Sequence, residues 1–278
     1  MTAQPGPQNS VQRCEADRLE VIDVGASTPA HQAPLLFVHG AWHGAWCWAE
    51  HYLNFFAGRG YRALAVSLRG HGKSSLQQRL RGCSGADYVD DVRSVAHALP
   101  TPPVLIGHSM GGYVVQKYLE SSPAPAGVLL ASISARGAVG LSRRLNFRHP
   151  WLMMGFHFTG RSLQLFNTPE RVRELLYSAT TPDADVVRYK ALLQEESQRV
   201  LLDVLMLNAV RPQRITTPLL VVGAEHDGAL AVSEQHALAR AYGTIAEIVP
   251  GMGHNMMLEP GWEAVAERIY AWLGARGL

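Results

Sequence analysis

Short apolar runs recur along the chain, and longer stretches with apolar residues near helical spacing lie between them. The runs predict strands at residues 19–24, 34–38, 62–66, 104–106, 127–133, 219–222 and 246–249. Several are apolar at successive positions, as in strands that helices cover on both faces. Helices are predicted at residues 47–57, 86–99, 110–120, 233–241 and 262–273. This alternation predicts an α/β fold with a mostly parallel central sheet flanked by helices.

The alternation is interrupted between residues 136 and 214. This block has apolar and basic helical stretches, punctuated by Pro150, Pro169 and Pro182, and no convincing strand. It predicts a helical cap inserted into the sheet domain. The core would then consist of residues 18–135 and 215–278. Residues 1–17 lack the basic and then apolar segments of a signal peptide, and we expect them to form a mobile N-terminal tail.

The most informative short segment is Gly-His-Ser-Met-Gly at residues 107–111, which fits the pattern G-x-S-x-G between a predicted strand and a predicted helix. The two outer glycines let strand and helix pass closely, because neither carries a Cβ atom. Such a turn raises the Ser109 hydroxyl at the carboxyl edge of the sheet. There the free N–H groups of the helix start stabilise negative charge. Ser109 is therefore the candidate nucleophile.

A serine hydroxyl needs a base and an orienting acid to act as a nucleophile at neutral pH. The chain offers both at the ends of predicted strands. Asp227 lies in the loop after strand 219–222, and His254 lies in the loop after strand 246–249. The three residues therefore form a candidate catalytic triad in the order Ser109, Asp227, His254.

This order and the serine motif resemble the α/β-hydrolase-fold serine hydrolases, and the likeness runs from about residue 19 to the C-terminus. His-Gly-Ala at residues 39–41 is similar to the loop that supplies one N–H group of the oxyanion hole in this family. The resemblance implies that the backbone N–H groups of Ala41 and Met110 hold the oxyanion. Residues 253–260 resemble the ending of bacterial esterases and monoacylglycerol-lipase-like enzymes, and residues 39–48 resemble the oxyanion loop of plant methylesterases.

The resemblance implies a serine esterase that cleaves a carboxylic ester or related acyl bond of a small apolar substrate through an acyl-enzyme, with no cofactor and no metal. Relatives that open epoxides or displace halides carry aspartate at the position of Ser109. Asn255 is neither the lysine of hydroxynitrile lyases nor the tryptophan of many carbon–carbon hydrolases. Three alternatives stay open on this fold: a carbon–carbon bond hydrolase, a cofactor-free oxygenase or perhydrolase, and a ligand-binding receptor.

Substrate choice is expected to depend on the predicted cap. Residues 136–169 hold five arginines and no acidic residue, and residues 151–158 are rich in methionine and aromatic side chains. Methionine adapts to irregular shapes, so this run could line a pocket for a flexible acyl or aryl group, or pack the cap against the core. The arginines could form a solvated face, recruit anionic substrates or touch a membrane surface. The expected substrate-binding residues are Trp42, His43, Trp151, Met154 and Phe158.

The charge and cysteine content of the chain exclude several classes of binding partner. Among 278 residues, 25 Lys and Arg face 23 Asp and Glu, and the net charge of +2 leaves no broad basic field for nucleic acid. Cys14, Cys47 and Cys83 show no C-x-x-C spacing, so we predict neither a disulfide framework nor a zinc site, and we expect a cytoplasmic location. Because apolar runs of about 18 residues are missing, stable membrane insertion is not expected. We expect a monomer or homodimer that acts on a small molecule.

Overall fold

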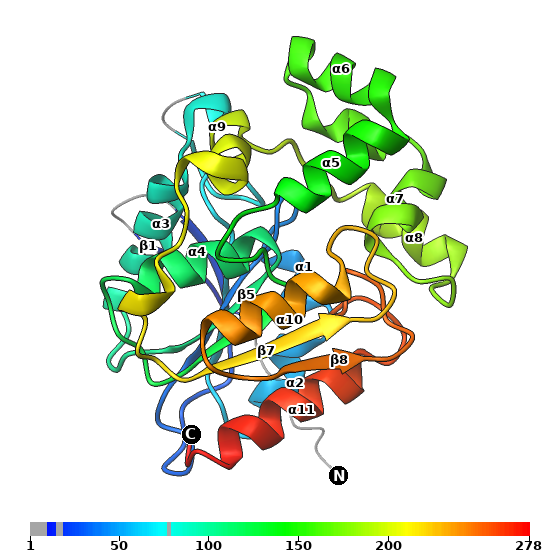
Figure 1. The fold of residues 1–278 in the computed structure, drawn as a ribbon. Helices are drawn as coiled ribbons and strands as arrows, with labels where there is room; N and C mark the ends of the chain where they lie inside the picture. The colour runs from blue at the N-terminus through cyan, green and yellow to red at the C-terminus, as the bar shows by residue number, and fades with distance from the viewer. Residues whose placement is uncertain (1–9, 15–18, 77–78) are drawn as a thin grey trace.

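A computed structural model describes residues 10–14, 19–76 and 79–278. Its centre is an eight-stranded sheet with the strand order β1-β2-β4-β3-β5-β6-β7-β8 (Figure 1). The pairs β1–β2 and β2–β4 are antiparallel and the other neighbouring pairs are parallel, which confirms the predicted sheet. The strands are β1 Ser10–Cys14, β2 Leu19–Val24, β3 Leu35–Val38, β4 Ala63–Val66, β5 Val104–His108, β6 Gly127–Leu130, β7 Leu219–Ala224 and β8 Ala246–Val249.

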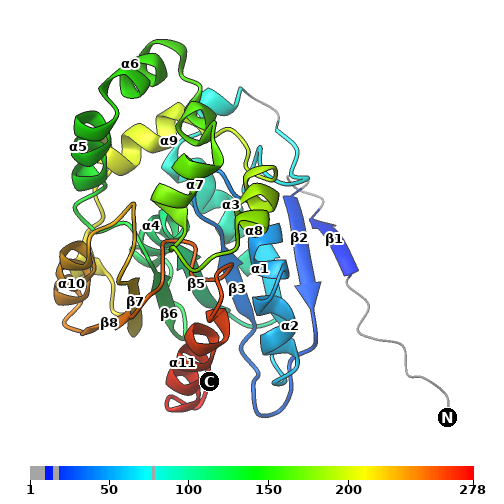
Figure 2. The same ribbon diagram turned by 90° about the vertical axis from the view of Figure 1, so that its right-hand side faces the viewer.

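Helices cover both faces of the sheet (Figure 2). One face is covered by α1 Trp46–Ala49, α2 Tyr52–Ala57 and α11 Trp262–Gly274, and the other by α3 Gly85–His97, α4 Met110–Leu119 and α10 Val232–Ala241. Along β3, Leu35 and Phe37 belong to one apolar core, whereas Leu36 and Val38 belong to the other. All four side chains are fully buried, which explains why the strand is apolar at successive positions.

The N-terminal segment differs from its prediction. Ser10–Cys14 pair with β2 in a register that runs from Ser10 opposite Asp23 to Cys14 opposite Leu19, so this part of the expected mobile tail is an edge strand. Its five residues include only one β-branched residue between polar neighbours, a pattern too short to stand out in the sequence. The rest of the predicted tail, residues 1–9 and 15–17, lies outside the described residues.

One strand also ends earlier than its apolar run. The run 127–133 predicts a strand to residue 133, but β6 ends at Leu130. Ala131 takes a left-handed φ of 41°, which is incompatible with extended backbone. The chain turns away from the sheet at this point and enters the segment predicted to be helical.

That segment forms a helical insertion between β6 and β7, and it contains no strand. It lies over the end of the sheet where the parallel strands finish (Figures 1 and 2). Pro150 and Pro169 each occupy the first turn of a helix, where proline costs no hydrogen bond. No helix among the described residues is long and apolar enough to cross a membrane. The helices are α5 Val139–Arg148, α6 Pro150–Thr159, α7 Pro169–Leu176, α8 Asp183–Lys190 and α9 Gln198–Leu202, with short helical turns at Ser162–Phe166, Asp203–Leu207 and Pro212–Arg214.

Candidate active site

Ser109 occupies the sharp turn between β5 and α4. Its φ of 53° and ψ of −116° are strained for a residue with a side chain. A Cβ atom on Gly107 would lie 2.5 Å from the Gly111 carbonyl oxygen, and one on Gly111 would lie 2.3 Å from the Val38 carbonyl oxygen. Only glycine fits at these two positions, as the motif predicts. The turn therefore depends on both glycines flanking the serine.

The structure brings Ser109, His254 and Asp227 together in one hydrogen-bonded series. The Nε2 atom of His254 lies 2.9 Å from the Ser109 hydroxyl, and its Nδ1 atom lies 2.8 Å from a carboxylate oxygen of Asp227. The side chains of His254 and Asp227 are 4% and 1% exposed. Ser109 and His254, which are 145 positions apart in the chain, are thus in direct contact, and the base and the acid are shielded from bulk water.

The hydrogen bonds of this series define its proton positions. The Asp227 carboxylate accepts from the backbone N–H groups of Ala229 and Leu230 at 2.8 and 2.7 Å, and these donors stabilise its negative charge. A carboxylate only accepts, so the Nδ1 atom of His254 carries a hydrogen and its Nε2 lone pair faces Ser109. The histidine is therefore oriented to accept the proton of the serine hydroxyl.

Two neighbouring side chains hold the loop that carries His254. The Nε2–H group of His108 donates to the His254 carbonyl oxygen at 3.0 Å. The buried Asn255 amide donates to the Tyr177 hydroxyl at 3.0 Å and to Nε2 of His43 at 3.1 Å. Tyr177 directly follows α7 in the insertion, so Asn255 links the histidine loop to both the insertion and the loop around residue 41.

The orientation of the Ala41 N–H group is fixed by two histidines. Nε2 of His39 accepts from the Leu68 N–H group at 3.0 Å, so its Nδ1 carries the hydrogen and donates to the Gly40 carbonyl oxygen at 2.8 Å. The backbone N–H of His43 donates to the same oxygen at 3.3 Å. In a trans peptide the carbonyl and the N–H point in opposite directions. The Ala41 N–H group therefore points away from these donors.

The peptide units on either side of Trp42 are held by residues of the insertion and by His43. Trp42 has a left-handed φ of 66°, which is uncommon outside glycine. Its N–H group donates to the Glu196 carboxylate at 3.4 Å, and its carbonyl accepts from the Gln194 N–H group at 2.9 Å. Nδ1 of His43 donates to the Ala41 carbonyl at 2.7 Å, and burial lowers the pKa of His43 to about 4, which keeps its ring neutral. Both peptide units flanking Trp42 are thus fixed.

Glu196 is itself part of a fully buried polar cluster. Its carboxylate forms an ion pair with Nε2 of His71 at 3.2 Å and accepts from the Tyr88 hydroxyl at 2.6 Å. Burial opposes both charges, but the facing carboxylate and the hydrogen bonds together raise the pKa of His71, and the facing histidine and the donors together lower the pKa of Glu196. Both shifts favour the charged forms of the two side chains, and the pair links the insertion to the loop that carries His71.

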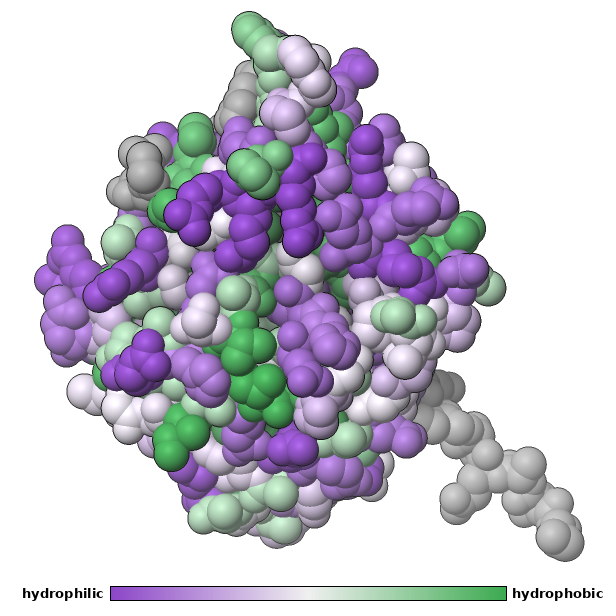
Figure 3. Space-filling view, turned by 45° about the vertical axis from the view of Figure 1, so that its right-hand side comes forward, coloured by the Kyte–Doolittle hydropathy of each residue, from purple (hydrophilic) through white to green (hydrophobic). Residues whose placement is uncertain are grey.

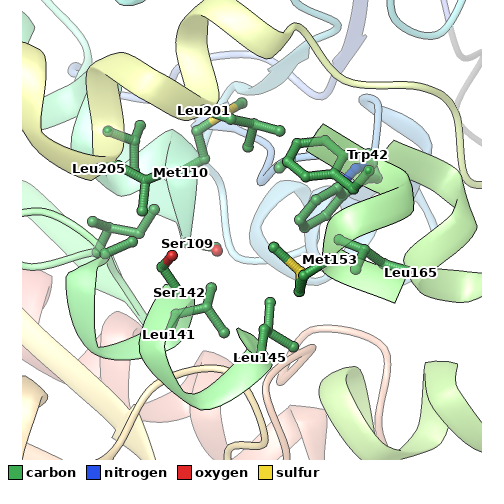
Figure 4. Close-up of a pocket in the computed structure, with 15 residues that line it drawn as sticks. Trp42, Ser109, Met110, Leu141, Ser142, Leu145, Met153, Leu165, Leu201 and Leu205 are labelled. Carbon is green, nitrogen blue, oxygen red and sulfur yellow. The ribbon is translucent and has the colours of Figure 1, made fainter. Parts of the chain in front are cut away.

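A pocket of about 630 Å³, counting its open mouth, lies beside Ser109 (Figure 4). It lies between the loop at residues 41–42, the serine turn and the insertion. Every lining residue other than Ser109 and Ser142 is apolar or aromatic, which suits an apolar ligand group. The lining consists of Ala41, Trp42, Ser109, Met110, Ile133, Ala138, Leu141, Ser142, Leu145, Met153, Phe156, Leu165, Leu201, Val204 and Leu205.

The five expected substrate-binding residues lie in different places. Trp42 lines the pocket, and its contact with a substrate stays a prediction. His43 is buried behind it, with its ring bonded to Ala41 and Asn255. Trp151, Met154 and Phe158 are not lining residues, because they project outward from α6 and are 79%, 44% and 85% exposed. For these four residues the structure corrects the prediction.

The same helix supplies other pocket residues that the sequence did not single out. Met153 and Phe156, three positions apart, lie on the inner face of α6. Because α6 is apolar on all sides, its sequence gives no sign of which face turns inward. Glu196 was also missed: it contacts Trp42 across 154 positions of sequence, and no local motif marks it.

The family model for the alpha/beta hydrolase family matches residues 35–268. This match covers most of the chain, and the sheet order, the serine turn and the hydrogen-bonded series agree with it. The protein belongs to the alpha/beta hydrolase family, which places it among the hydrolases.

Individual relatives are distant. A monoacylglycerol lipase of Mycolicibacterium smegmatis is 26% identical over 81% of this chain and 82% of its own length. Norfluorocurarine synthase 2 of Strychnos sp is 26% identical over 52% of this chain, and the match spans only 56% of that relative. The solved structure of an esterase from Exiguobacterium antarcticum superposes with a TM-score of 0.73 at 18% identity, covering 95% of this chain and 98% of that one. This last likeness shows the fold.

Proposed function

We propose that the protein is a serine esterase that hydrolyses carboxylic esters with an apolar acyl or aryl group through an acyl-enzyme. One observation carries the proposal: the Ser109–His254–Asp227 series, at 2.9 and 2.8 Å, opens into an apolar pocket. Nucleophile, base and orienting acid are within hydrogen-bonding reach of one another, and the pocket offers room for the reacting carbonyl beside them.

In the proposed reaction, Nε2 of His254 accepts the hydroxyl proton as Ser109 attacks the ester carbonyl carbon. Asp227 holds the imidazole in the required tautomer and stabilises its cation. His254 then protonates the leaving alcohol, which departs and leaves an acyl group on Ser109. A water molecule, deprotonated by His254, hydrolyses this acyl-enzyme and restores the free serine.

The negative charge on the substrate oxygen is assigned to two backbone N–H groups, those of Ala41 and Met110. Met110 is the first residue of α4, and an N–H group at a helix start has no partner within the helix. The Ala41 N–H group has its direction set by the bonds to the preceding carbonyl. Both residues line the pocket with Ser109, which supports an oxyanion hole at this point.

The relatives agree with ester cleavage as the chemistry, since a monoacylglycerol lipase and an esterase are among them. We further propose that residues 136–214 act as a cap that selects substrates over a core of residues 18–135 and 215–278. Insertion residues make up most of the pocket lining, which supports that role. The acyl chain would lie against Leu141, Leu145 and Met153.

A fluorophosphonate probe tests the proposal directly, because it reacts with an activated serine. We expect mass spectrometry to find the label on Ser109, and expect p-nitrophenyl esters of short and medium acyl chains to compete with it. An unlabelled protein that still hydrolyses these esters would contradict the acyl-enzyme. A protein that neither takes the label nor hydrolyses any ester would favour a binding role.

The pocket makes a prediction about chain length. Met153→Trp should fill the pocket and lower kcat/KM for p-nitrophenyl octanoate at least about tenfold, with a smaller effect on the acetate ester. The matched control is Met154→Trp, the next residue, whose side chain is exposed on the other face of α6. Steady-state kinetics on both esters would check this, and equal effects of the two variants would refute the assigned lining.

The buried carboxylate of Glu196 makes a second prediction. Glu196→Gln removes the charge that faces His71 and leaves one acceptor oxygen where the carboxylate uses two, for the Trp42 N–H group and the Tyr88 hydroxyl. We therefore expect kcat to fall about tenfold with a smaller change in KM, and the free energy of unfolding to fall by about 2 kcal/mol. Glu195→Gln is the control, because the Glu195 carboxylate binds Ser162 within the insertion. It should lower stability and leave kcat unchanged. If Glu196→Gln also altered only stability, its role would be purely structural.

A further inference from the structure

The α5–α6 hairpin has two different faces. Toward the pocket, α5 presents Leu141 and Leu145 and α6 presents Met153 and Phe156. Its outer face carries four exposed apolar side chains, which we call the apolar tip: Phe147, Trp151, Met154 and Phe158. The two helices therefore separate the pocket from the outside by one layer of helix.

The apolar tip is unusually exposed for its composition. Phe147, Trp151 and Phe158 are 89%, 79% and 85% exposed, and Met154 is 44% exposed. A helix that is apolar on all sides normally lies in a core or in a membrane. Here α6 forms the outermost point of the molecule (Figures 1 and 2), and Figure 3 shows hydrophobic side chains at that point. Such a patch marks an interaction surface.

The charged residues of the segment that carries the apolar tip are of one sign. Residues 136–169 hold five arginines and no acidic residue. Arg144 and Arg148 pair with Glu234 and Glu174, whereas Arg143 is exposed and has no carboxylate partner among the described residues. Arg143 lies one helical turn before Phe147 on the same side of α5. The surface therefore combines aromatic side chains with positive charge.

We propose that the apolar tip docks on an anionic lipid surface. Tryptophan and phenylalanine enter the headgroup and acyl boundary of a bilayer, and nearby arginines are attracted to anionic headgroups. A second copy of this chain fits less well, because a twofold interface would place each basic face against its own like charge. The docked hairpin would bring its inner face next to the lipid, and the substrates would then be lipid acyl esters. This last step rests on the proposed esterase function.

Vesicle binding tests the docking. The full-length protein should sediment with vesicles of phosphatidylglycerol and phosphatidylcholine and bind pure phosphatidylcholine vesicles much more weakly. Of the six tryptophans, Trp151 is the exposed one and the others are buried or half-buried. The tryptophan emission should therefore move to shorter wavelength on binding, and this shift should be missing in Trp151→Phe, which keeps an aromatic anchor.

Matched variants separate the tip from general surface effects. Trp151→Asp and Phe158→Asp should each weaken binding roughly tenfold or more. Ile245→Asp is the apolar control, because Ile245 is 82% exposed and precedes β8, at the end of the sheet away from the insertion. Arg143→Gln should weaken binding to anionic vesicles about fivefold, and Arg276→Gln, after the end of α11, should not.

The outcomes distinguish this inference from the proposed chemistry. Trp151→Asp should hydrolyse soluble p-nitrophenyl acetate like the wild type and lose activity on a monoacylglycerol held in anionic vesicles. Ser109→Ala should bind vesicles normally and hydrolyse neither substrate. The proposal of lipid docking is overturned if the wild-type protein does not bind anionic vesicles, or if Ile245→Asp weakens binding as much as Trp151→Asp. It is also overturned if sedimentation shows a dimer that Trp151→Asp dissociates.

Discussion

Replacing Ser109 with alanine is expected to lower kcat for a p-nitrophenyl ester by about 10⁴-fold or more, which is the largest effect predicted for this protein. The variant lacks the only atom that can form the acyl-enzyme in the proposed reaction. The fold should survive, because alanine keeps the Cβ atom and removes one hydroxyl from the edge of a pocket. Initial rates under saturating ester, with unfolding curves to verify stability, would measure the effect.

Ser142→Ala is the matched control for this experiment. Ser142 is the only other hydroxyl-bearing residue in the pocket lining, and it belongs to α5 in the insertion. Its loss should change kcat less than about threefold, because His254 is hydrogen-bonded to Ser109. Similar losses in both variants would mean that the pocket, and not the nucleophile, governs the rate.

Acid is expected to destabilise the protein well above the pH at which its carboxylates protonate. Burial lowers the pKa of His43 to about 4 and holds the pKa values of His39 and His108 well below their usual range. The unfolded chain binds protons at these histidines from about pH 6.5 downward, and the folded chain does not, so stability is lost as pH falls. His43 alone should cost about 2 kcal/mol by pH 5, and the other two add to this loss.

Urea unfolding at several pH values between 7 and 4.5 would measure this dependence. His43→Asn should reduce the slope of unfolding free energy against pH, because one buried titrating ring is removed. The ion pair of His71 and Glu196 acts in other windows. The raised pKa of His71 gives stability that is lost as pH rises above about 6.5, and the lowered pKa of Glu196 gives stability that is lost only below about pH 4.5. Equal stability at pH 7 and pH 5 would refute the assignment of neutral buried histidines.

Local sequence was sufficient to predict the fold and the hydrogen-bonded series. Strand, glycine-flanked turn and helix follow one another directly around Ser109, so one short motif specifies its backbone. Asp227 and His254 each follow an apolar strand, and the parallel sheet brings such strand ends to one edge. Each of these positions depends on its own sequence segment and on the regular geometry of the sheet, so the sequence was sufficient to predict it.

The inner surface of the insertion could not be predicted in the same way. The orientation of α6 depends on packing against neighbours, and its uniform apolarity hides that choice, so Met154 was expected inside and Met153 is there instead. The bond from Trp42 to Glu196 joins segments 154 positions apart. The bonds by which His39 and His43 hold the loop at residues 40–42 could not be predicted, because their acceptors are backbone atoms in a loop whose shape only the folded chain shows.

The hydrogen bonds of Trp42 with Gln194 and Glu196 also limit how this enzyme can be re-engineered or can diversify. Exchanging the whole insertion for that of a relative would remove the two residues of the insertion that help His39 and His43 to hold the loop beside Ser109, together with the pocket wall. A chimera in which only the part of the insertion before Gln194 is exchanged keeps Gln194 and Glu196. The boundary for such an exchange therefore lies just before Gln194. Helices α5 to α8 can be exchanged to alter selectivity, whereas residues 194–197 should be kept together with the core that they contact.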